Sequence, residues 1–336
     1  MKIKMKNKIK TYSCREAATT WAALLLLLIA ISGCDRLLEE DPRSLITPTE
    51  FFQEPGDAQA AGDAIYTHLR GSGVYGQYYW LMGALASDEG MVNGFHPEMA
   101  ELSAFTLTPH NPVVAQVWSE LYAAIHTANF AITRLPEAPV SEAEATRLVA
   151  EARFMRALFY FDLVRMFGEV PLSREANTDG AQVSLLPRAP IDSLYKQIEA
   201  DFTFATEVLP QKGAAGRPGA LAAVAYLAKV ALAQKAYNRA FQLNRFVIQS
   251  NQYALVADYA DLFKVANNHS AEILFAVNFG PGDQAPLNTR TLPGTLTGAS
   301  PWGLPTDALA AAFDPQDRRL QVSLLTAGQQ RYVAKF

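Results

Sequence analysis

The sequence lacks the residue clusters on which most enzymes and metalloproteins depend. Its five histidines are scattered along the chain without an H-E-x-x-H spacing, so no pattern indicates a catalytic metal. Neither a phosphate-binding P-loop nor a dinucleotide-binding glycine pattern is present. Asp88 and Glu89 are adjacent carboxylates, whereas a glycosidase needs two carboxylates that face one bond from opposite sides. We therefore expect no enzyme activity, no metal and no cofactor.

Cysteine is scarce too, because only Cys14 and Cys34 occur among 336 residues. Basic residues near the N-terminus precede an apolar run, 22–32, that is too short to span a bilayer comfortably and is typical of a secretory signal. The run closes with "ISGC", residues 31–34, which resembles a bacterial lipobox, whose cysteine becomes the lipidated first residue. We expect a signal peptide over 1–33 and a lipid on Cys34. An ordinary signal peptide that ends near a cysteine is the alternative.

Processing at Cys34 would change the chemistry of the remaining chain. Cys14 would leave with the signal and Cys34 would carry lipid, so no thiol would remain for a disulfide, for catalysis or for zinc. The removed segment holds six basic residues and one acidic residue, so the formal net charge would fall from −4 to −9. An acidic exported domain is poorly suited to nucleic acid. Residues 34–46 are expected to form an acidic tether to the lipid anchor.

Hydrophobic residues make up half of the chain, and most of them recur with a helical period. The period and the capping residues predict helices over 47–70, 115–135, 141–167, 190–208, 220–234 and 237–249. Residues 71–112 are rich in glycine and aromatic residues and show no helical period. Beyond them we expect a buried strand over 272–279, a short helix over 306–313 and a second strand near 331–336.

The helix predicted over 141–167 is apolar on several faces, which is typical of a helix wedged between neighbours. We expect its Arg156, Asp162 and Arg165 to be paired structural charges rather than catalytic groups. Helices 220–234 and 237–249 carry small residues, Ala228 and Ala240 among them, and so resemble a tetratricopeptide-type pair. The sequence therefore predicts a mostly α fold: a tetratricopeptide-like helical array with an irregular lobe that bears loops and strands.

One long motif carries a family resemblance. The stretch "EARFMRALFYFDLVRMFGEVPL", residues 151–172, resembles the signature helix of the SusD/RagB family of Bacteroidetes outer-membrane lipoproteins. Other segments match that family in order: the lipobox with "LLEEDPRSLITPTEFF", then "IYTHL", "WSELYAAIHTANFAI", "GRPGALAAVAYLAKVAL", "AEILFAVNF" and "FDPQDRRL". The resemblance implies a SusD-like helical region over 47–250 and the start of the family's C-terminal region over 251–336. It also implies that the chain is C-terminally incomplete.

The aromatic loop and the segment around Trp302 are the candidate ligand site. Aromatic faces can stack on sugar rings, and amide or carboxylate groups can bond sugar hydroxyls. The resemblance implies ligand contacts from these same parts of the chain. The alternative is that Tyr79 and Trp80 are buried against the helical array. The candidate ligand-binding residues are Tyr78, Tyr79, Trp80, Asp88, Asn93, Phe95, His96 and Trp302.

By resemblance, the expected function is nutrient binding at the cell surface. The ligand would be a glycan or oligosaccharide, which the protein would pass to a SusC-like, TonB-dependent outer-membrane transporter. The protein would be lipid-anchored in the outer membrane and face the exterior, with no nucleic-acid partner. The alternative from another class is a lipid-anchored scaffold whose helical array makes protein contacts only.

Overall fold

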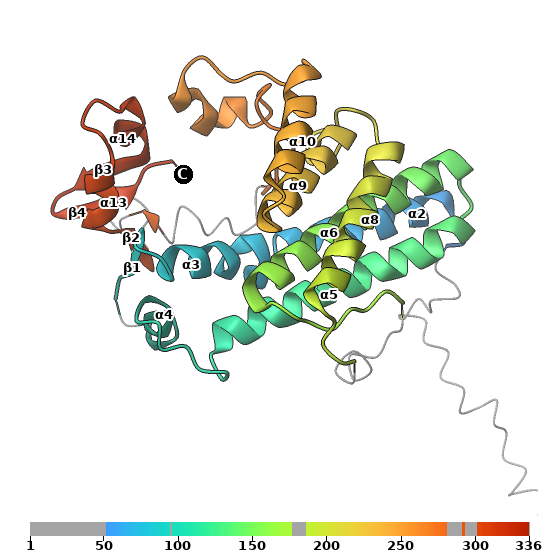
Figure 1. The fold of residues 1–336 in the computed structure, drawn as a ribbon, viewed down its shortest axis with the longest axis horizontal. Helices are drawn as coiled ribbons and strands as arrows, with labels where there is room; N and C mark the ends of the chain where they lie inside the picture. The colour runs from blue at the N-terminus through green and yellow to red at the C-terminus, as the bar shows by residue number, and fades with distance from the viewer. Residues whose placement is uncertain (1–51, 95, 177–185, 281–290, 293–300, 336) are drawn as a thin grey trace, which may run out of the picture. The chain divides into compact units, whose positions relative to one another are not determined.

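Helices dominate the computed structural model (Figure 1), which describes residues 52–94, 96–176, 186–280, 291–292 and 301–335. The predicted signal peptide, Cys34 and the tether over 34–46 lie outside these residues. The mostly α, tetratricopeptide-like fold class predicted from the sequence is confirmed. Of the helices that the structure describes, none combines the length and the apolar character that a membrane span requires.

Six long helices form where the hydrophobic period predicts them. Apart from the start of the first helix, predicted at 47 and found at Pro55, their ends lie within a few residues of the predicted ones. Local capping residues set these ends: Asn111 accepts hydrogen bonds from the backbone N–H groups of Val113 and Val114 at the start of one helix. A capping box between Glu54 and Asp57 begins the first of them at Pro55. The helices are α2 (Pro55–Leu69), α5 (Pro112–Arg134), α6 (Glu142–Phe167), α8 (Ile191–Val208), α9 (Ala220–Ala233) and α10 (Tyr237–Gln249).

Helix α6 is the centre of the helical core. It begins at its predicted cap, where the Ser141 hydroxyl accepts from the backbone N–H of Glu144, and it ends at Gly168, whose φ of 71° suits a residue without a Cβ. Every residue from Leu148 to Val164 is buried except Arg153. The helix contacts α2, α5 and α8, three of the helices around it in Figure 1. The prediction that it is wedged between neighbours is therefore confirmed.

The buried guanidinium of Arg156 has partners on two neighbouring helices. Arg156 donates from Nε and Nη2 to the carboxylate of Asp201 on α8, with both distances 2.8 Å, and from Nη1 to Asn129 Oδ1 on α5, also at 2.8 Å. Arg156 is 5% exposed and Asp201 1% exposed. Because a buried charge is costly unless it is paired and hydrogen-bonded, this arrangement fixes three helices against one another. The prediction that Arg156 is a paired structural charge is confirmed.

The pair α9 and α10 packs as the small residues predict. Ala228 and Ala240 are both buried. Helix α9 contacts both α10 and α8. Small side chains let the helix backbones approach closely. Helix α10 also exposes several large apolar side chains, namely those of Tyr237, Phe241, Phe246 and Ile248.

Two sequence expectations are wrong in the described residues. Residues 71–112 hold a π-helical turn η2 (Ser72–Gly76), helix α3 (Tyr78–Leu85), strand β1 (Gly90–Val92) and helix α4 (Pro97–Ser103) instead of irregular loop alone. Residues 272–279 form no strand. Their apolar pattern reflects packing against α6, because Phe275 lies edge-on to Phe154 with ring centroids 5.5 Å apart. An extended segment without a partner strand has no ladder of hydrogen bonds.

The lobe beyond α10 is built from short elements. Its strand β2 (Gly303–Pro305) pairs with β1 from the earlier segment, and its strands β3 (Leu324–Ala327) and β4 (Gln330–Val333) pair with each other, so that two antiparallel ribbons form. The short helix predicted over 306–313 is present, as is the strand near 331–336. The remaining elements are η3 (Leu135–Glu137), η4 (Tyr259–Phe263), η5 (Val265–Asn267), α13 (Asp307–Ala312) and α14 (Arg318–Ser323).

Candidate ligand-binding site

Pairing of β1 with β2 joins the two sequence segments that hold the candidate ligand residues. Gly90, Met91 and Val92 lie opposite Pro305, Leu304 and Gly303, in that order. One step further along the ribbon, the Asn93 backbone N–H donates to the carbonyl oxygen of Trp302 at 2.9 Å, and Asn93 Nδ2 donates to the carbonyl of Pro301 at 2.8 Å. The ribbon therefore places Asn93 directly beside Trp302, although 208 residues separate the Asn93 side chain from Pro301 in sequence.

Two further rings gather at Trp302. The Tyr78 ring, from the first residue of α3, stacks with it at 6.4 Å between centroids and 24° between planes. The His96 ring, from the N-cap of α4, lies 4.8 Å away at 42°. All three rings are partly exposed. We call Tyr78, Asn93, His96 and Trp302 the Trp302 cluster.

The other candidate residues lie apart from this cluster or outside the described structure. Tyr79 donates its hydroxyl to Asp162 Oδ1 at 2.6 Å, so it faces the helical core. Trp80 is half-buried, and its Nε1 has no hydrogen-bond partner in the residues that the structure describes. Asp88 is exposed, and its backbone carbonyl accepts from the Thr306 hydroxyl. Phe95 lies outside the described residues.

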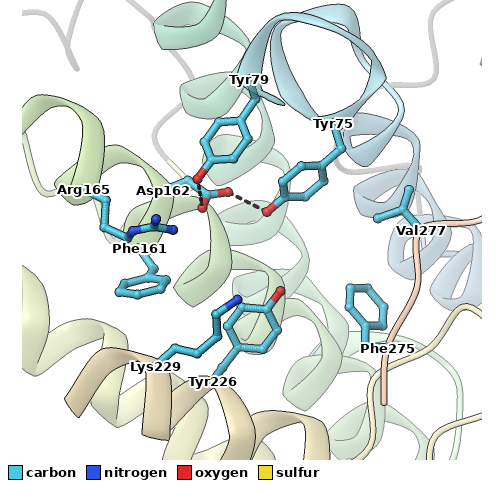
Figure 2. A pocket seen from close by; sticks show the side chains of 9 residues that line it. All are labelled: Tyr75, Tyr79, Phe161, Asp162, Arg165, Tyr226, Lys229, Phe275 and Val277. Carbon is cyan, nitrogen blue, oxygen red and sulfur yellow. Dashed lines mark hydrogen bonds between the residues drawn. The ribbon is translucent and has the colours of Figure 1, made fainter. Parts of the chain in front are cut away.

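Tyr79 lines a hollow of about 240 Å³, shown in Figure 2. At its centre the carboxylate of Asp162, 3% exposed, accepts hydrogen bonds from the hydroxyls of Tyr75 and Tyr79. Burial raises the pKa of Asp162 to about 6, against the pull of these two donors. Burial also raises the pKa of both tyrosines, so they remain protonated donors at neutral pH. Further side chains that line the hollow are Phe161, Arg165, Tyr226, Lys229, Phe275 and Val277.

At this hollow, the partners of Asp162 and Arg165 differ from the charge pairing that the sequence predicted. Asp162 is held by two tyrosine hydroxyls rather than by a cation, and the Arg165 guanidinium lies over the Phe161 ring at 5.2 Å. The sequence gives little sign of this arrangement, because Tyr75 and Asp162 are 87 residues apart.

Another hollow, of about 400 Å³, lies where the two ribbons meet. It was not predicted from the sequence, because its sides come from residues near 91, 305 and 330. Arg331 Nη1 donates to Asp307 Oδ1 there, which joins β4 to α13. The lining residues are Met91, Leu304, Pro305, Asp307, Thr326, Gln329, Gln330 and Arg331. We call this space the ribbon hollow.

The Trp302 cluster presents several groups that can contact a ligand. It offers aromatic faces, an imidazole and an amide. Nδ2 of Asn93 is occupied by Pro301, while Oδ1 accepts no hydrogen bond from the described residues. No group of three or more His, Cys, Asp or Glu side chains in the described parts of the chain is placed to hold a metal ion.

Comparison with known proteins places this chain in a family. The family model described as "Starch-binding associating with outer membrane" matches residues 62–232, half of the 336-residue chain. A SusD-like protein of Formosa agariphila is 30% identical over 263 residues, which cover 76% of this chain and 52% of that protein. A SusD-like protein of Bacteroides ovatus is 31% identical over 200 residues, which cover 55% and 36%. The chain thus spans about half the length, or less, of these relatives.

Solved structures agree with this grouping. A laminarin-binding SusD-like protein is similar, with a TM-score of 0.70 and 25% identity, over 84% of this chain and 72% of that one. A SusD superfamily protein of Bacteroides vulgatus shares the fold at 19% identity, with a TM-score of 0.75 over 84% of this chain and 68% of that one. From its family model, its relatives and its helical fold, the chain belongs to the SusD-like family, whose model is described as starch-binding and associated with the outer membrane.

Proposed function

We propose that this protein binds a glycan or oligosaccharide at the Trp302 cluster. The observation that carries the proposal is the meeting of Trp302, Tyr78 and His96, three partly exposed rings from separate elements, beside the amide of Asn93. A sugar ring has flat C–H faces ringed by hydroxyl groups. Aromatic rings cover such faces, and a free amide oxygen accepts a hydroxyl hydrogen bond.

The energies suit reversible capture. One ring stacked on Trp302 together with one hydroxyl hydrogen bond contributes on the order of 1–2 kcal/mol. One such contact alone is too weak to retain a glycan, because a millimolar Kd corresponds to about 4.1 kcal/mol, but a few contacts together would give binding that is still readily reversible. We therefore propose capture and hand-over without bond breaking, with no enzyme activity.

The location follows from the N-terminal sequence and the family. Lipidation of Cys34 would anchor the protein in the outer membrane, where it would face the exterior and pass its ligand to a SusC-like, TonB-dependent transporter. The lipobox pattern at residues 31–34 and the family's association with the outer membrane support this. Acyl chains contribute about 0.8 kcal/mol for each buried CH₂ group, so several chains would hold the protein firmly.

The alternative is a lipid-anchored scaffold that uses its helical array for protein contacts only. The observation that favours it is that α10 exposes several large apolar side chains, Phe241 and Phe246 among them. The two functions differ in one property, because a scaffold should bind a protein partner and no glycan.

A binding screen on the soluble protein tests the proposal. Starch and laminarin are suitable first probes, since the family description and one similar structure name them. Retarded migration in gels that contain a glycan, with no new reducing ends formed on incubation, would support capture without cleavage. Migration unaffected by every glycan of a broad panel would favour the scaffold, and release of reducing ends would contradict the proposed lack of catalysis.

A further inference from the structure

The two faces of the β1–β2 ribbon have different surroundings. A Cβ added at Gly303 would lie 3.2 Å from a methyl group of Leu81, and one at Gly90 would lie 2.6 Å from the carbonyl oxygen of Ala84. Both positions therefore face α3. Successive residues of a strand point to opposite faces, and residues directly opposite each other in an antiparallel pair share a face. Met91, with its partner Leu304, must then lie on the face turned away from α3.

The same rule places Trp302 and Asn93 on this outward face. Trp302 is two residues before Leu304, and Asn93 is two residues after Met91. Asn93 also bonds the Trp302 carbonyl, which continues the ladder. Met91 is 49% exposed, so the face is open to solvent at this point. The outward face is therefore a continuous strip, with Trp302 and Asn93 at one end and Met91 and Leu304 next along it.

The ribbon hollow opens directly onto this strip. Met91 and Leu304 form its apolar side, and the β3–β4 ribbon supplies Thr326 and Gln330 opposite them. Two residues of a strand advance the chain by about 7 Å, so the hollow begins about that far from Trp302. One sugar ring stacked on Trp302 does not reach into the hollow, whereas a chain of linked rings does.

The hollow has polar groups but no net charge. Gln329, Gln330 and Thr326 are neutral donors and acceptors, and the one cation, Arg331, is paired with the one anion, Asp307, in the described lining. An apolar floor with neutral amides and a hydroxyl suits a ligand rich in uncharged hydroxyl groups. A carboxylate or sulfate group would have to compete with Asp307 for Arg331.

We propose that the ribbon hollow is a second subsite for the same ligand, so that the protein recognises a linear, uncharged oligosaccharide by at least two adjoining units. This inference rests on the proposed glycan function. It adds that the ligand extends from the Trp302 cluster along the outward face of β1–β2 into the hollow. Affinity must then depend on chain length and on the β3–β4 ribbon.

Calorimetric titration with soluble laminari-oligosaccharides and malto-oligosaccharides of increasing length tests it. In the series that binds, affinity should rise from the monosaccharide to the tetrasaccharide by roughly tenfold or more, as each net hydrogen bond gained strengthens binding severalfold. The double variant Thr326→Ala/Gln330→Ala should lose roughly tenfold for the tetrasaccharide, with a loss that grows with chain length. Gln321→Ala, at an exposed glutamine of α14, is the matched control and should bind as the wild type does.

Three outcomes would overturn the inference while leaving the proposed function intact. Affinity could reach its full value with the monosaccharide. The double variant could bind every length as the wild type does, or an acidic oligogalacturonide could bind more tightly than the neutral series. Failure of the wild type to bind any glycan would instead refute the proposed function, and this inference with it.

Discussion

Removing one partner of the buried pair Arg156 and Asp201 should destabilise the fold by about 3–5 kcal/mol. Both side chains are almost fully buried, and the guanidinium makes two 2.8 Å hydrogen bonds to the carboxylate. Asp201→Ala would leave a guanidinium without its counter-charge between α6 and α8. Asn129, its other partner, accepts only from Nη1, so the freed N–H groups on Nε and Nη2 would lose their acceptor. The cost therefore comes mainly from the stranded charge.

The double variant Arg156→Met/Asp201→Leu separates this cost from the value of the pair. Replacing both residues with apolar side chains leaves no buried charge without a partner. We therefore expect a smaller loss of unfolding free energy than in either single variant. Urea unfolding followed by circular dichroism measures each free energy. Arg239→Ala, which breaks an exposed pair with Glu199, is the control and should cost at most about 1 kcal/mol. A cost below about 1 kcal/mol for Asp201→Ala would refute the reasoning.

Three further predictions concern the core, the buried carboxyl and the anchor. Phe154→Ala should cost about 3–5 kcal/mol in the same unfolding assay, because it opens a cavity among three packed rings; a loss below about 1 kcal/mol would place Phe154 outside the core. The pKa of Asp162 is raised from 3.8 to about 6 in the folded protein, so the folded state holds this proton more tightly than the unfolded state does. The resulting contribution to the free energy of unfolding is complete below pH 3.8 and is lost as the pH rises through 6. Asp162→Asn should therefore flatten the wild type's fall in Tm across that window, and parallel profiles would contradict it. Cys34→Ala should move the protein from the membrane fraction to the soluble fraction and abolish palmitate labelling. Retained labelling would refute the lipid site.

Long helices were predictable because their signals are local. Helix α6 is defined within one segment of sequence: it begins after the Ser141 cap, continues through apolar residues and ends at Gly168, which can adopt a positive φ. Helix α3 escaped prediction because "YYWLMGAL" is short and apolar at almost every position, so no period distinguishes its faces. The apolar run 272–279 has the composition of a strand, but composition cannot reveal that no strand lies beside it.

The candidate site was only partly predictable for a related reason. Aromatic and amide residues near 78–96 and a tryptophan in a Gly/Pro-rich segment indicate ligand contacts by their type, and the structure brings Tyr78, Asn93, His96 and Trp302 together. Tyr78 and Tyr79 diverge because consecutive residues of a helix point in different directions. The ribbon hollow depends on pairing between segments more than 200 residues apart, which no local pattern encodes.

The most direct test of the central claim is a calorimetric titration of Trp302→Ala with the glycan that the wild type binds, beside a melting curve. Loss of the stacked contact, on the order of 1–2 kcal/mol, should weaken binding roughly tenfold or more. The Tm should change little, because the Trp302 ring is partly exposed. Phe154→Ala, at a fully buried phenylalanine of α6, is the contrasting variant and should lower the Tm and leave the affinity unchanged. Unaltered glycan affinity in Trp302→Ala would contradict the account.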